Sequence, residues 1–199
     1  MNIAFIGAHG VGKTTTLERM KVLRPEMIFF DENVRRLTKI FGMSTPFNII
    51  EQYGTGVLAL ASLNASSVAD PEMNNTLDLR RHSISDRGGV DQLAYFLSFR
   101  EKPLDNILEP LIRAAAKHRV GLVDMFIYFP IGVFPLVGDE MRPAEVDVQR
   151  RVDDGIHQAL HELEIAPERV HYLRAVEIEE RVQEIITLLP KKEEVEKSQ

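Results

Sequence analysis

Short apolar runs alternate with longer helical patterns along this chain. Ile3 to Ile6, Met27 to Phe30 and Phe126 to Phe129 are continuously apolar, which is typical of parallel strands that helices cover on both faces. The alternation of such runs with helices indicates βαβ units wound into one parallel sheet. It predicts five strands: Asn2 to Ile6, Glu26 to Asp31, His82 to Asp86, Met125 to Pro130 and Arg169 to Arg174.

Apolar residues at helical spacing predict helices between these strands. Residues 32–81, between the second and third strands, form a far longer connection than a simple crossover needs. There we expect one long helix from Asn48 to Val68, weakened by Gly54 and Gly56, and a shorter one from Pro71 to Arg81. The other helices are expected at Thr14 to Leu23, Val90 to Arg100, Leu104 to His118, Pro143 to Leu163 and Glu177 to Leu189.

A phosphate-binding pattern follows the first predicted strand directly. Residues 7–14 read Gly-Ala-His-Gly-Val-Gly-Lys-Thr and fit G-x-x-x-x-G-K-[ST]. Glycines let backbone N–H groups surround phosphate oxygens, and the helix that follows adds its positive dipole end. Lys13 is expected to reach the β and γ phosphates, and the Thr14 hydroxyl to hold Mg²⁺. The alternative is a glycine-rich turn that binds nothing. The residues expected to bind a nucleoside triphosphate are Gly7, His9, Gly10, Val11, Gly12, Lys13, Thr14 and Thr15.

An acidic and a basic residue, Asp86 and Arg87, stand at the end of the third predicted strand. Ligands of open α/β sheets bind in the crevice at this carboxyl edge. Asp86 is therefore a candidate Mg²⁺ ligand, directly or through water, and Arg87 a candidate phosphate contact. The alternative is an aspartate beside a glycine turn, with Arg87 merely exposed.

Two carboxylates, Asp31 and Glu32, stand where the second predicted strand gives way to a helix. Phosphoryl transfer to an alcohol needs a base that orients the hydroxyl and accepts its proton, which makes Glu32 a candidate. Glu32 and Arg35 are three residues apart, so on a helix they share a face and are placed to bind one substrate from two sides. Asp31 and Arg36 are further candidates. The alternative is that an acid here caps the helix while the arginines are solvated.

Glycines, prolines and arginines are combined in the segment Gly132 to Arg151. This composition predicts a mobile loop in front of a helix. Arg142, Arg150 and Arg151 are expected on a lid that brings positive charge to the transferring phosphoryl group as water is excluded. The alternative is an ordinary loop whose arginines pair with neighbouring aspartates.

Composition limits the class of protein. A chain of 199 residues with 44% hydrophobic content supplies one buried core, so we expect a single domain over residues 1–190, with a helical insertion at about 44–81 and a lid at about 132–151. No segment is apolar enough to span a bilayer, and Met1 leads straight into a strand, so a cytoplasmic protein is expected.

The absence of cysteine excludes disulfides and a thiol nucleophile. The net charge of −6 argues against a large nucleic-acid surface. The charge-balanced tail, residues 191–199, is expected to be a solvated end.

Together these motifs resemble the small AAA-type P-loop kinases of bacteria and phages. The resemblance rests on the P-loop, Glu32-x-x-Arg35, Ser85-Asp86-Arg87-x-x-x-Asp91-x-x-Ala94-Tyr95 and Asp139-x-x-Arg142. These kinases are similar to the nicotinamide riboside kinase module of NAD regulators and, more distantly, to deoxynucleoside and thymidylate kinases. The chain lacks the Asp-Arg-Glu-Pro stretch that thymidylate kinases carry after the second strand.

The resemblance implies a P-loop NTPase fold: a three-layer α/β architecture with a five-stranded parallel sheet in the order 2-3-1-4-5 and helices on both faces. It implies an ATP–Mg²⁺ site at Gly10 to Thr15, an acid–base role for Glu32 and a lid arginine at Arg142. It also implies an acceptor contact from Gln52, which on sequence grounds alone is a surface residue.

The function expected from the resemblance is transfer of the γ-phosphoryl group of ATP to a nucleoside, nucleotide or nucleoside-like acceptor. One alternative is a kinase that acts on DNA, at an end or on a modified base such as hydroxymethyluracil. Another is a nucleotide-driven switch without a small acceptor. No membrane partner is expected, and a homodimer is left open.

Overall fold

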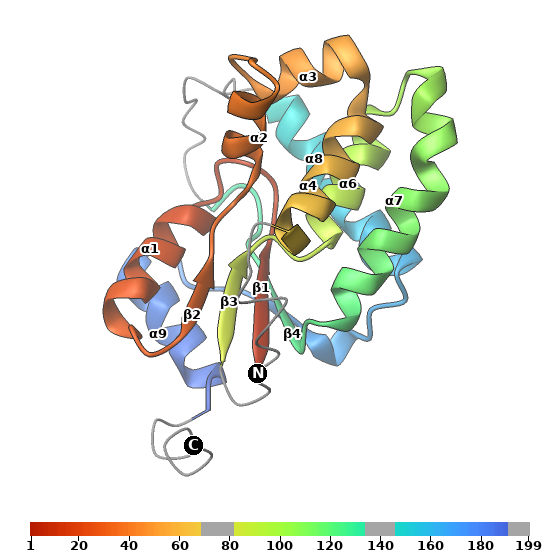
Figure 1. The fold of residues 1–199 in the computed structure, drawn as a ribbon. Helices are drawn as coiled ribbons and strands as arrows, with labels where there is room; N and C mark the ends of the chain where they lie inside the picture. The colour runs from red at the N-terminus through yellow and green to blue at the C-terminus, as the bar shows by residue number, and fades with distance from the viewer. Residues whose placement is uncertain (69–81, 134–145, 191–199) are drawn as a thin grey trace.

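A five-stranded parallel sheet in the order β2-β3-β1-β4-β5 forms the centre of the protein (Figure 1). The computed structural model describes residues 1–68, 82–133 and 146–190. The predicted fold class and strand order are confirmed, although four strands are shorter than predicted because their pairing with neighbours ends sooner. The strands are β1 (Asn2–Ile6), β2 (Ile28–Phe30), β3 (Ser83–Asp86), β4 (Met125–Tyr128) and β5 (Val170–Tyr172).

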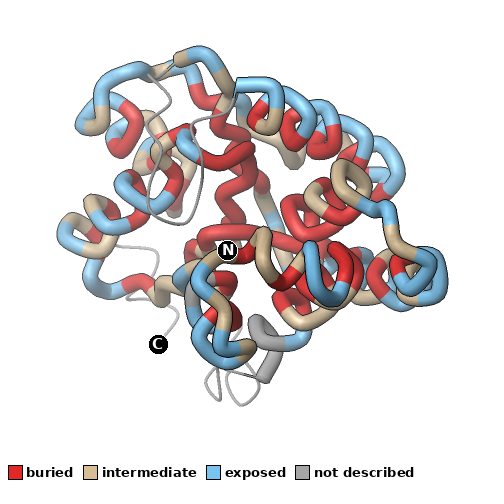
Figure 2. Tube along the Cα trace, turned by 90° about the horizontal axis from the view of Figure 1, so that it is seen from above, coloured by how far each residue is buried: buried red, intermediate tan, exposed pale blue. Residues whose placement is uncertain are grey.

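Helices cover both faces of this sheet (Figures 1 and 2). Because successive side chains of a strand point to opposite faces, β1 contributes Ile3 and Phe5 to one core and Ala4 and Ile6 to the other. The first core is closed by α1 (Lys13–Leu23) and α9 (Ile178–Leu188). The second is closed by α4 (Thr55–Val68), α6 (Val90–Phe99), α7 (Pro103–Gly121) and α8 (Val146–Glu162).

The long connection between β2 and β3 contains α2 (Val34–Ile40) and α3 (Pro46–Tyr53) before α4. The prediction of one helix from Asn48 to Val68 is wrong, because Gly54 ends α3 with φ 99° and ψ 161°. Asp105 of α7 stabilises the break: its Oδ1 accepts the Gly56 N–H at 2.7 Å. A Cβ atom at Gly54 would lie 2.7 Å from the same oxygen, so a helix running through this point would lose both the glycine turn and the contact with α7.

Four predictions for this fold fall wholly or partly outside the described residues. The helix expected at residues 71–81 and the tail at residues 191–199 are not described, and neither is most of the expected lid. The helix expected from residue 143 is described from Val146 onward. The domain limits stay a prediction. No helix within residues 1–68, 82–133 and 146–190 has the length and apolarity needed to cross a membrane.

Candidate active site

The P-loop, residues 7–14, connects β1 to α1 at the carboxyl edge of the sheet. Its first glycine lies against the end of β4, where a Cβ atom at Gly7 would be 2.7 Å from the Phe129 carbonyl oxygen. Any larger residue would therefore push the loop off the sheet. The loop leads directly into the N-terminus of α1, whose unpaired N–H groups and dipole favour an anion.

Lys13 is buried within the P-loop. Its Nζ donates hydrogen bonds to the carbonyl oxygens of Gly7 at 2.6 Å and Ala8 at 2.8 Å. Burial lowers the pKa of Lys13, and the nearby carboxylate of Asp91 opposes that shift. The loop thus carries a partly desolvated cation, which interacts with phosphate more strongly than an exposed one does.

The two predicted metal ligands lie side by side. Thr14 Oγ1 donates a hydrogen bond to Asp86 Oδ2 at 2.7 Å, joining the start of α1 to the end of β3. The other oxygen, Asp86 Oδ1, is buried and has no hydrogen-bond partner within the described part of the chain. A buried carboxylate oxygen without a donor is costly, and Mg²⁺ is commonly held by one or two oxygen side chains plus phosphates and waters. Thr14 and Asp86 therefore fit a magnesium site.

Asp91, near the start of α6, is fully buried beside the P-loop. Its Oδ1 accepts the Gly7 N–H at 3.2 Å and lies 4.0 Å from Arg87 Nη1. Burial raises the pKa of Asp91, while Lys13 and Arg87 oppose the rise. Asp91 was quoted in the family motif but was not predicted as a site residue. The signal that could have identified it is its place in that motif, four residues after Arg87.

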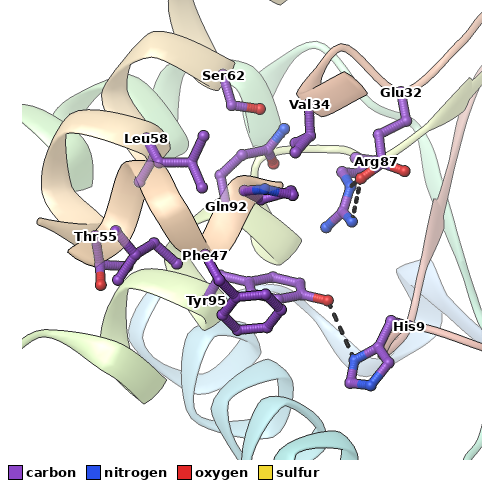
Figure 3. A pocket seen from close by; sticks show the side chains of 13 residues that line it. His9, Glu32, Val34, Phe47, Thr55, Leu58, Ser62, Arg87, Gln92 and Tyr95 are labelled. Carbon is purple, nitrogen blue, oxygen red and sulfur yellow. Dashed lines mark hydrogen bonds and ion pairs between the residues drawn. The ribbon is translucent and has the colours of Figure 1, made fainter. Parts of the chain in front are cut away.

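Glu32 and Arg87 form a buried ion pair between the segment after β2 and the end of β3 (Figure 3). Arg87 Nε and Nη2 both donate to Glu32 Oε1, at 2.9 Å and 2.5 Å. The Arg87 guanidinium also lies over the Tyr95 ring, 5.0 Å from its centroid. Burial alone would lower the pKa of Arg87, but the Glu32 carboxylate raises it above its ordinary value. The alternative that Arg87 is merely exposed is therefore wrong.

The backbone at Arg87 is strained, because this non-glycine residue has a φ of 106°. Such a conformation costs about 1–3 kcal/mol and persists only where the surroundings enforce it. Here the Arg87 N–H bonds to the Phe5 carbonyl at 3.2 Å while the side chain is held by Glu32 and Tyr95. This strained backbone stands at the end of β3, where the Arg87 side chain reaches Glu32 in the segment after β2.

A pocket of about 600 Å³, counting its open mouth, lies beside this ion pair (Figure 3). Helices α3, α4 and α6 supply most of its wall, which is mainly apolar and aromatic, and the P-loop supplies His9. The lining residues are His9, Glu32, Val34, Pro46, Phe47, Ile50, Thr55, Leu58, Ala59, Ser62, Arg87, Gln92 and Tyr95.

Two polar side chains of α6 complete the pocket. Gln92 Oε1 accepts the Gly89 N–H at 2.9 Å, so the NH₂ group of this amide is the part that can bind a ligand. The Tyr95 hydroxyl lies 3.5 Å from Nδ1 of His9, as Figure 3 shows. Through this contact the pocket wall and the P-loop touch. Neither Gln92 nor Tyr95 was predicted as a site residue.

Several predicted site residues are not brought to the pocket. Gln52 is exposed on α3, where it lines a separate hollow beside Asn48, because Pro46, Phe47 and Ile50 occupy the face toward the pocket. Arg150 and Arg151 are exposed on α8, and the Arg151 guanidinium lies over the Phe99 ring.

Other candidates have different outcomes. Asp31 is exposed and bonds Lys21 at 2.6 Å, so it neither caps α2 nor joins the site. Arg36 is exposed as well. Arg142 and the side chain of Arg35 lie outside the described residues, so their roles stay predictions.

Two further contacts to the P-loop come from distant helices. Gln149 of α8 donates from Nε2 to the His9 carbonyl at 2.8 Å, and Arg181 of α9 donates from Nη1 to the Val11 carbonyl at 2.9 Å. Both side chains are buried. Sequence analysis missed them because a lone Gln or Arg on an amphipathic helix carries no signal that its partner lies 140 or 170 residues away.

Comparisons with known proteins agree with this geometry. A family model described as an AAA domain matches residues 2–181. No curated protein matches the sequence. Among solved structures, a NadR protein in complex with NAD and AMP-PNP has a TM-score of 0.68 at 14% identity, over 96% of this chain and 50% of that chain. The chain thus spans about half the length of that NadR protein.

Two kinases of similar length share the fold. Deoxyadenosine kinase from M. mycoides has a TM-score of 0.63 at 13% identity, over 94% of this chain and 98% of that chain. Thymidylate kinase from Ehrlichia chaffeensis has a TM-score of 0.54 at 16% identity, over 96% of this chain and 98% of that chain. At these identities the likeness establishes a shared fold.

Proposed function

This chain belongs to the AAA domain family, and we propose that it transfers the γ-phosphoryl group of ATP to a hydroxyl group of a nucleoside-like acceptor. One observation carries the proposal: the apolar pocket is bounded by P-loop residue His9 and by the buried Glu32–Arg87 pair. A molecule in this pocket would present its end to a carboxylate and to the P-loop at once. The fold shared with a deoxyadenosine kinase, a thymidylate kinase and a NadR protein bound to AMP-PNP supports the same reading.

The P-loop side of the site suits a nucleoside triphosphate. Lys13 and the N–H groups at the start of α1 would bind the β and γ phosphates. Thr14 and Asp86 would hold Mg²⁺, which neutralises charge on these phosphates when bound. Because phosphoryl transfer depends mostly on positioning and charge stabilisation, these groups supply what the donor half of the reaction requires.

Glu32 is the base in this proposal. The acceptor oxygen forms a bond to the γ phosphorus as the bond to the β,γ-bridging oxygen breaks, and the hydroxyl proton passes to the Glu32 carboxylate. Arg87 fixes Oε1 of Glu32 with two hydrogen bonds. Arg87 thereby orients the base.

The charges of the pocket favour a neutral acceptor over a monophosphate. Of the described side chains in its wall, Arg87 is the one full cation, and it is bonded to Glu32. A phosphate group placed here would meet a cation already neutralised by a carboxylate. The aromatic rings of Phe47 and Tyr95 and the amide of Gln92 suit a planar base with hydrogen-bonding edges.

A transfer assay with the full chain tests this function. The protein would be incubated with Mg²⁺, γ-labelled ATP and a panel of nucleosides, nicotinamide riboside, nucleoside monophosphates and an oligonucleotide that contains hydroxymethyluracil. We expect the label on the hydroxyl of a neutral nucleoside-type acceptor. Label on the oligonucleotide would replace the proposal with a DNA kinase. Phosphate release at a rate that no acceptor changes would replace it with a nucleotide-driven switch.

A further inference from the structure

Arg181 of α9 is among the most deeply buried large side chains of the protein, with 1% of its surface exposed. Burial lowers its pKa to about 10, so it remains a cation at neutral pH. Burying a cation is expensive unless its N–H groups are well bonded. The function proposed above gives this arginine no part, although it lies directly against the P-loop.

The guanidinium of Arg181 links three parts of the donor side of the sheet. Nη1 donates to the Val11 carbonyl of the P-loop at 2.9 Å, and Nε donates to the Ala175 carbonyl, in the turn before α9, at 3.1 Å. The group also lies over the Phe129 ring, 5.5 Å from its centroid, at the end of β4. A Cβ atom at Gly12 would lie 2.9 Å from Nη1, so the guanidinium packs closely on the loop.

The bond to Val11 has a consequence for the next residue. A peptide unit is planar and trans, so its carbonyl and the following N–H point in opposite directions. When the Val11 carbonyl points to Arg181, the Gly12 N–H must point away from it. Gln149 holds the His9 carbonyl in the same way at 2.8 Å and so directs the Gly10 N–H. Carbonyls on the outside of a loop leave its N–H groups for an anion on the inside.

We propose that Arg181 is a positioning residue for the donor phosphates, which holds the Val11–Gly12 peptide so that the Gly12 N–H faces the phosphate side of the P-loop. The inference rests on nucleotide binding at the P-loop, and it is independent of which acceptor is phosphorylated. Without Arg181 the peptide loses its outward bond and populates orientations in which this N–H is turned away from phosphate. The nucleotide then has to reorder the loop on binding, which weakens its affinity.

Arg169 provides a matched control. It donates from Nη2 to the Val120 carbonyl at 2.9 Å and also to the Val123 carbonyl, and its guanidinium lies over the Phe126 ring at 5.5 Å. Arg169 thus makes the same kinds of contact as Arg181. Val120 and Val123 precede β4, at the edge of the sheet opposite the P-loop, so Arg169 has no place at the donor site.

The test compares Arg181→Met with Arg169→Met in the full chain. Affinity for Mg·ADP would be measured by calorimetric titration, and stability by thermal unfolding without nucleotide. Both variants are expected to melt earlier than wild type. Mg·ADP should bind about tenfold more weakly to Arg181→Met, the loss expected for one charge-assisted hydrogen bond. Its affinity for Arg169→Met should stay within about twofold, the spread expected of a change remote from the site.

The outcomes separate the inference from the proposed function. If wild type binds no Mg·ADP, nucleotide binding itself fails. If wild type binds it and Arg181→Met binds equally well, or if Arg169→Met loses as much affinity, the positioning role is overturned. Should Arg181→Met not fold, the lysine variants decide. A lysine retains the charge but cannot reproduce the two-carbonyl geometry, so Arg181→Lys must bind Mg·ADP more weakly than Arg169→Lys, and equal affinities contradict the proposal.

Discussion

The P-loop and the pocket beside it are built from different parts of the chain. The P-loop is one contiguous segment between β1 and α1, and its carbonyl oxygens and N–H groups are fixed by side chains from α6, α8 and α9. The pocket is assembled from side chains of five separate segments, including α3, α4 and α6. The proposed donor phosphates would be bound by backbone groups, whereas the proposed acceptor would be recognised by side-chain shape.

This difference explains how one fold serves several acceptors. Backbone groups of the P-loop are set by glycine positions and tolerate little change, since a Cβ atom at Gly7 would collide with the sheet. The pocket wall can change one side chain at a time without disturbing the sheet. The Glu32–Arg87 pair lines the pocket, and Arg87 also lies beside Asp91, which accepts a hydrogen bond from the P-loop residue Gly7. The predictions below change one region at a time.

The largest effect is expected in the donor region. Lys13→Ala removes the cation of the P-loop and should lower phosphoryl transfer by about a thousandfold, as the loss of a preorganised charge contact does. The measurement is the initial rate of transfer at saturating acceptor. Lys21→Ala, on the same helix but paired with Glu18 and Asp31 at the surface, is the control and should transfer at the wild-type rate. Wild-type turnover by Lys13→Ala would show that the P-loop takes no part in phosphoryl transfer.

The next largest effect is expected at the Glu32–Arg87 pair, and it concerns the stability of the protein. Arg87→Met leaves the Glu32 carboxylate buried without its partner and should lower the free energy of unfolding by about 3–5 kcal/mol. Urea denaturation measures it. Arg113→Met breaks two partly exposed pairs, with Glu109 and with Glu162, and should cost less than about 1 kcal/mol. Equal losses of unfolding free energy in the two variants would show that the buried pair contributes no more to stability than the partly exposed pairs.

A smaller effect is expected in the acceptor region. Phe47→Ala removes an aromatic wall of the pocket and should raise the KM for the acceptor about tenfold, while the KM for ATP stays unchanged. Steady-state kinetics with each substrate varied in turn separate the two constants. Phe41 packs on Tyr53, 5.7 Å between centroids, outside the pocket, so Phe41→Ala should leave both KM values unchanged. A rise in the KM for ATP instead would mean that the pocket binds the donor.

The smallest effects are expected for two residues that sequence analysis assigned to the substrate. Gln52 and Arg151 are both exposed, and Arg151 lies over Phe99. Gln52→Ala and Arg151→Ala should therefore change kcat/KM by less than about twofold, as surface substitutions away from a site do. A tenfold fall in either variant would place that residue in the site after all.

Sequence could predict most of the fold and the donor region because their signals are local. The alternation of short strand-like runs with helical patterns predicted all five strands, and the P-loop pattern placed Lys13 and Thr14 with their neighbours in one segment. Glu32, Asp86 and Arg87 could be placed as well, because the ends of parallel strands meet at one edge of the sheet.

The pocket and the helix break could not be predicted, because they depend on contacts between segments that are far apart in sequence. Gln92 and Phe47 point into the pocket only because α3, α4 and α6 pack together there. The break at Gly54 depends on Asp105 of α7, which caps Gly56 from 49 residues away. The same holds for Gln52, for which the family resemblance implied an acceptor contact: Pro46, Phe47 and Ile50 of α3 face the pocket, and Gln52 lines a separate hollow.

Glu32→Gln tests most directly the claim that the two regions meet at Glu32 in one phosphotransferase site. The variant keeps the shape of the side chain but removes its capacity to accept a proton, and Glu51→Gln, exposed on α3, is the matched control. The measurement is the single-turnover rate of transfer to the acceptor, together with the Kd for ATP. We expect the rate to fall by about 10²–10⁴-fold, as loss of a general base does, with the Kd for ATP unchanged. A wild-type rate in Glu32→Gln would contradict the account.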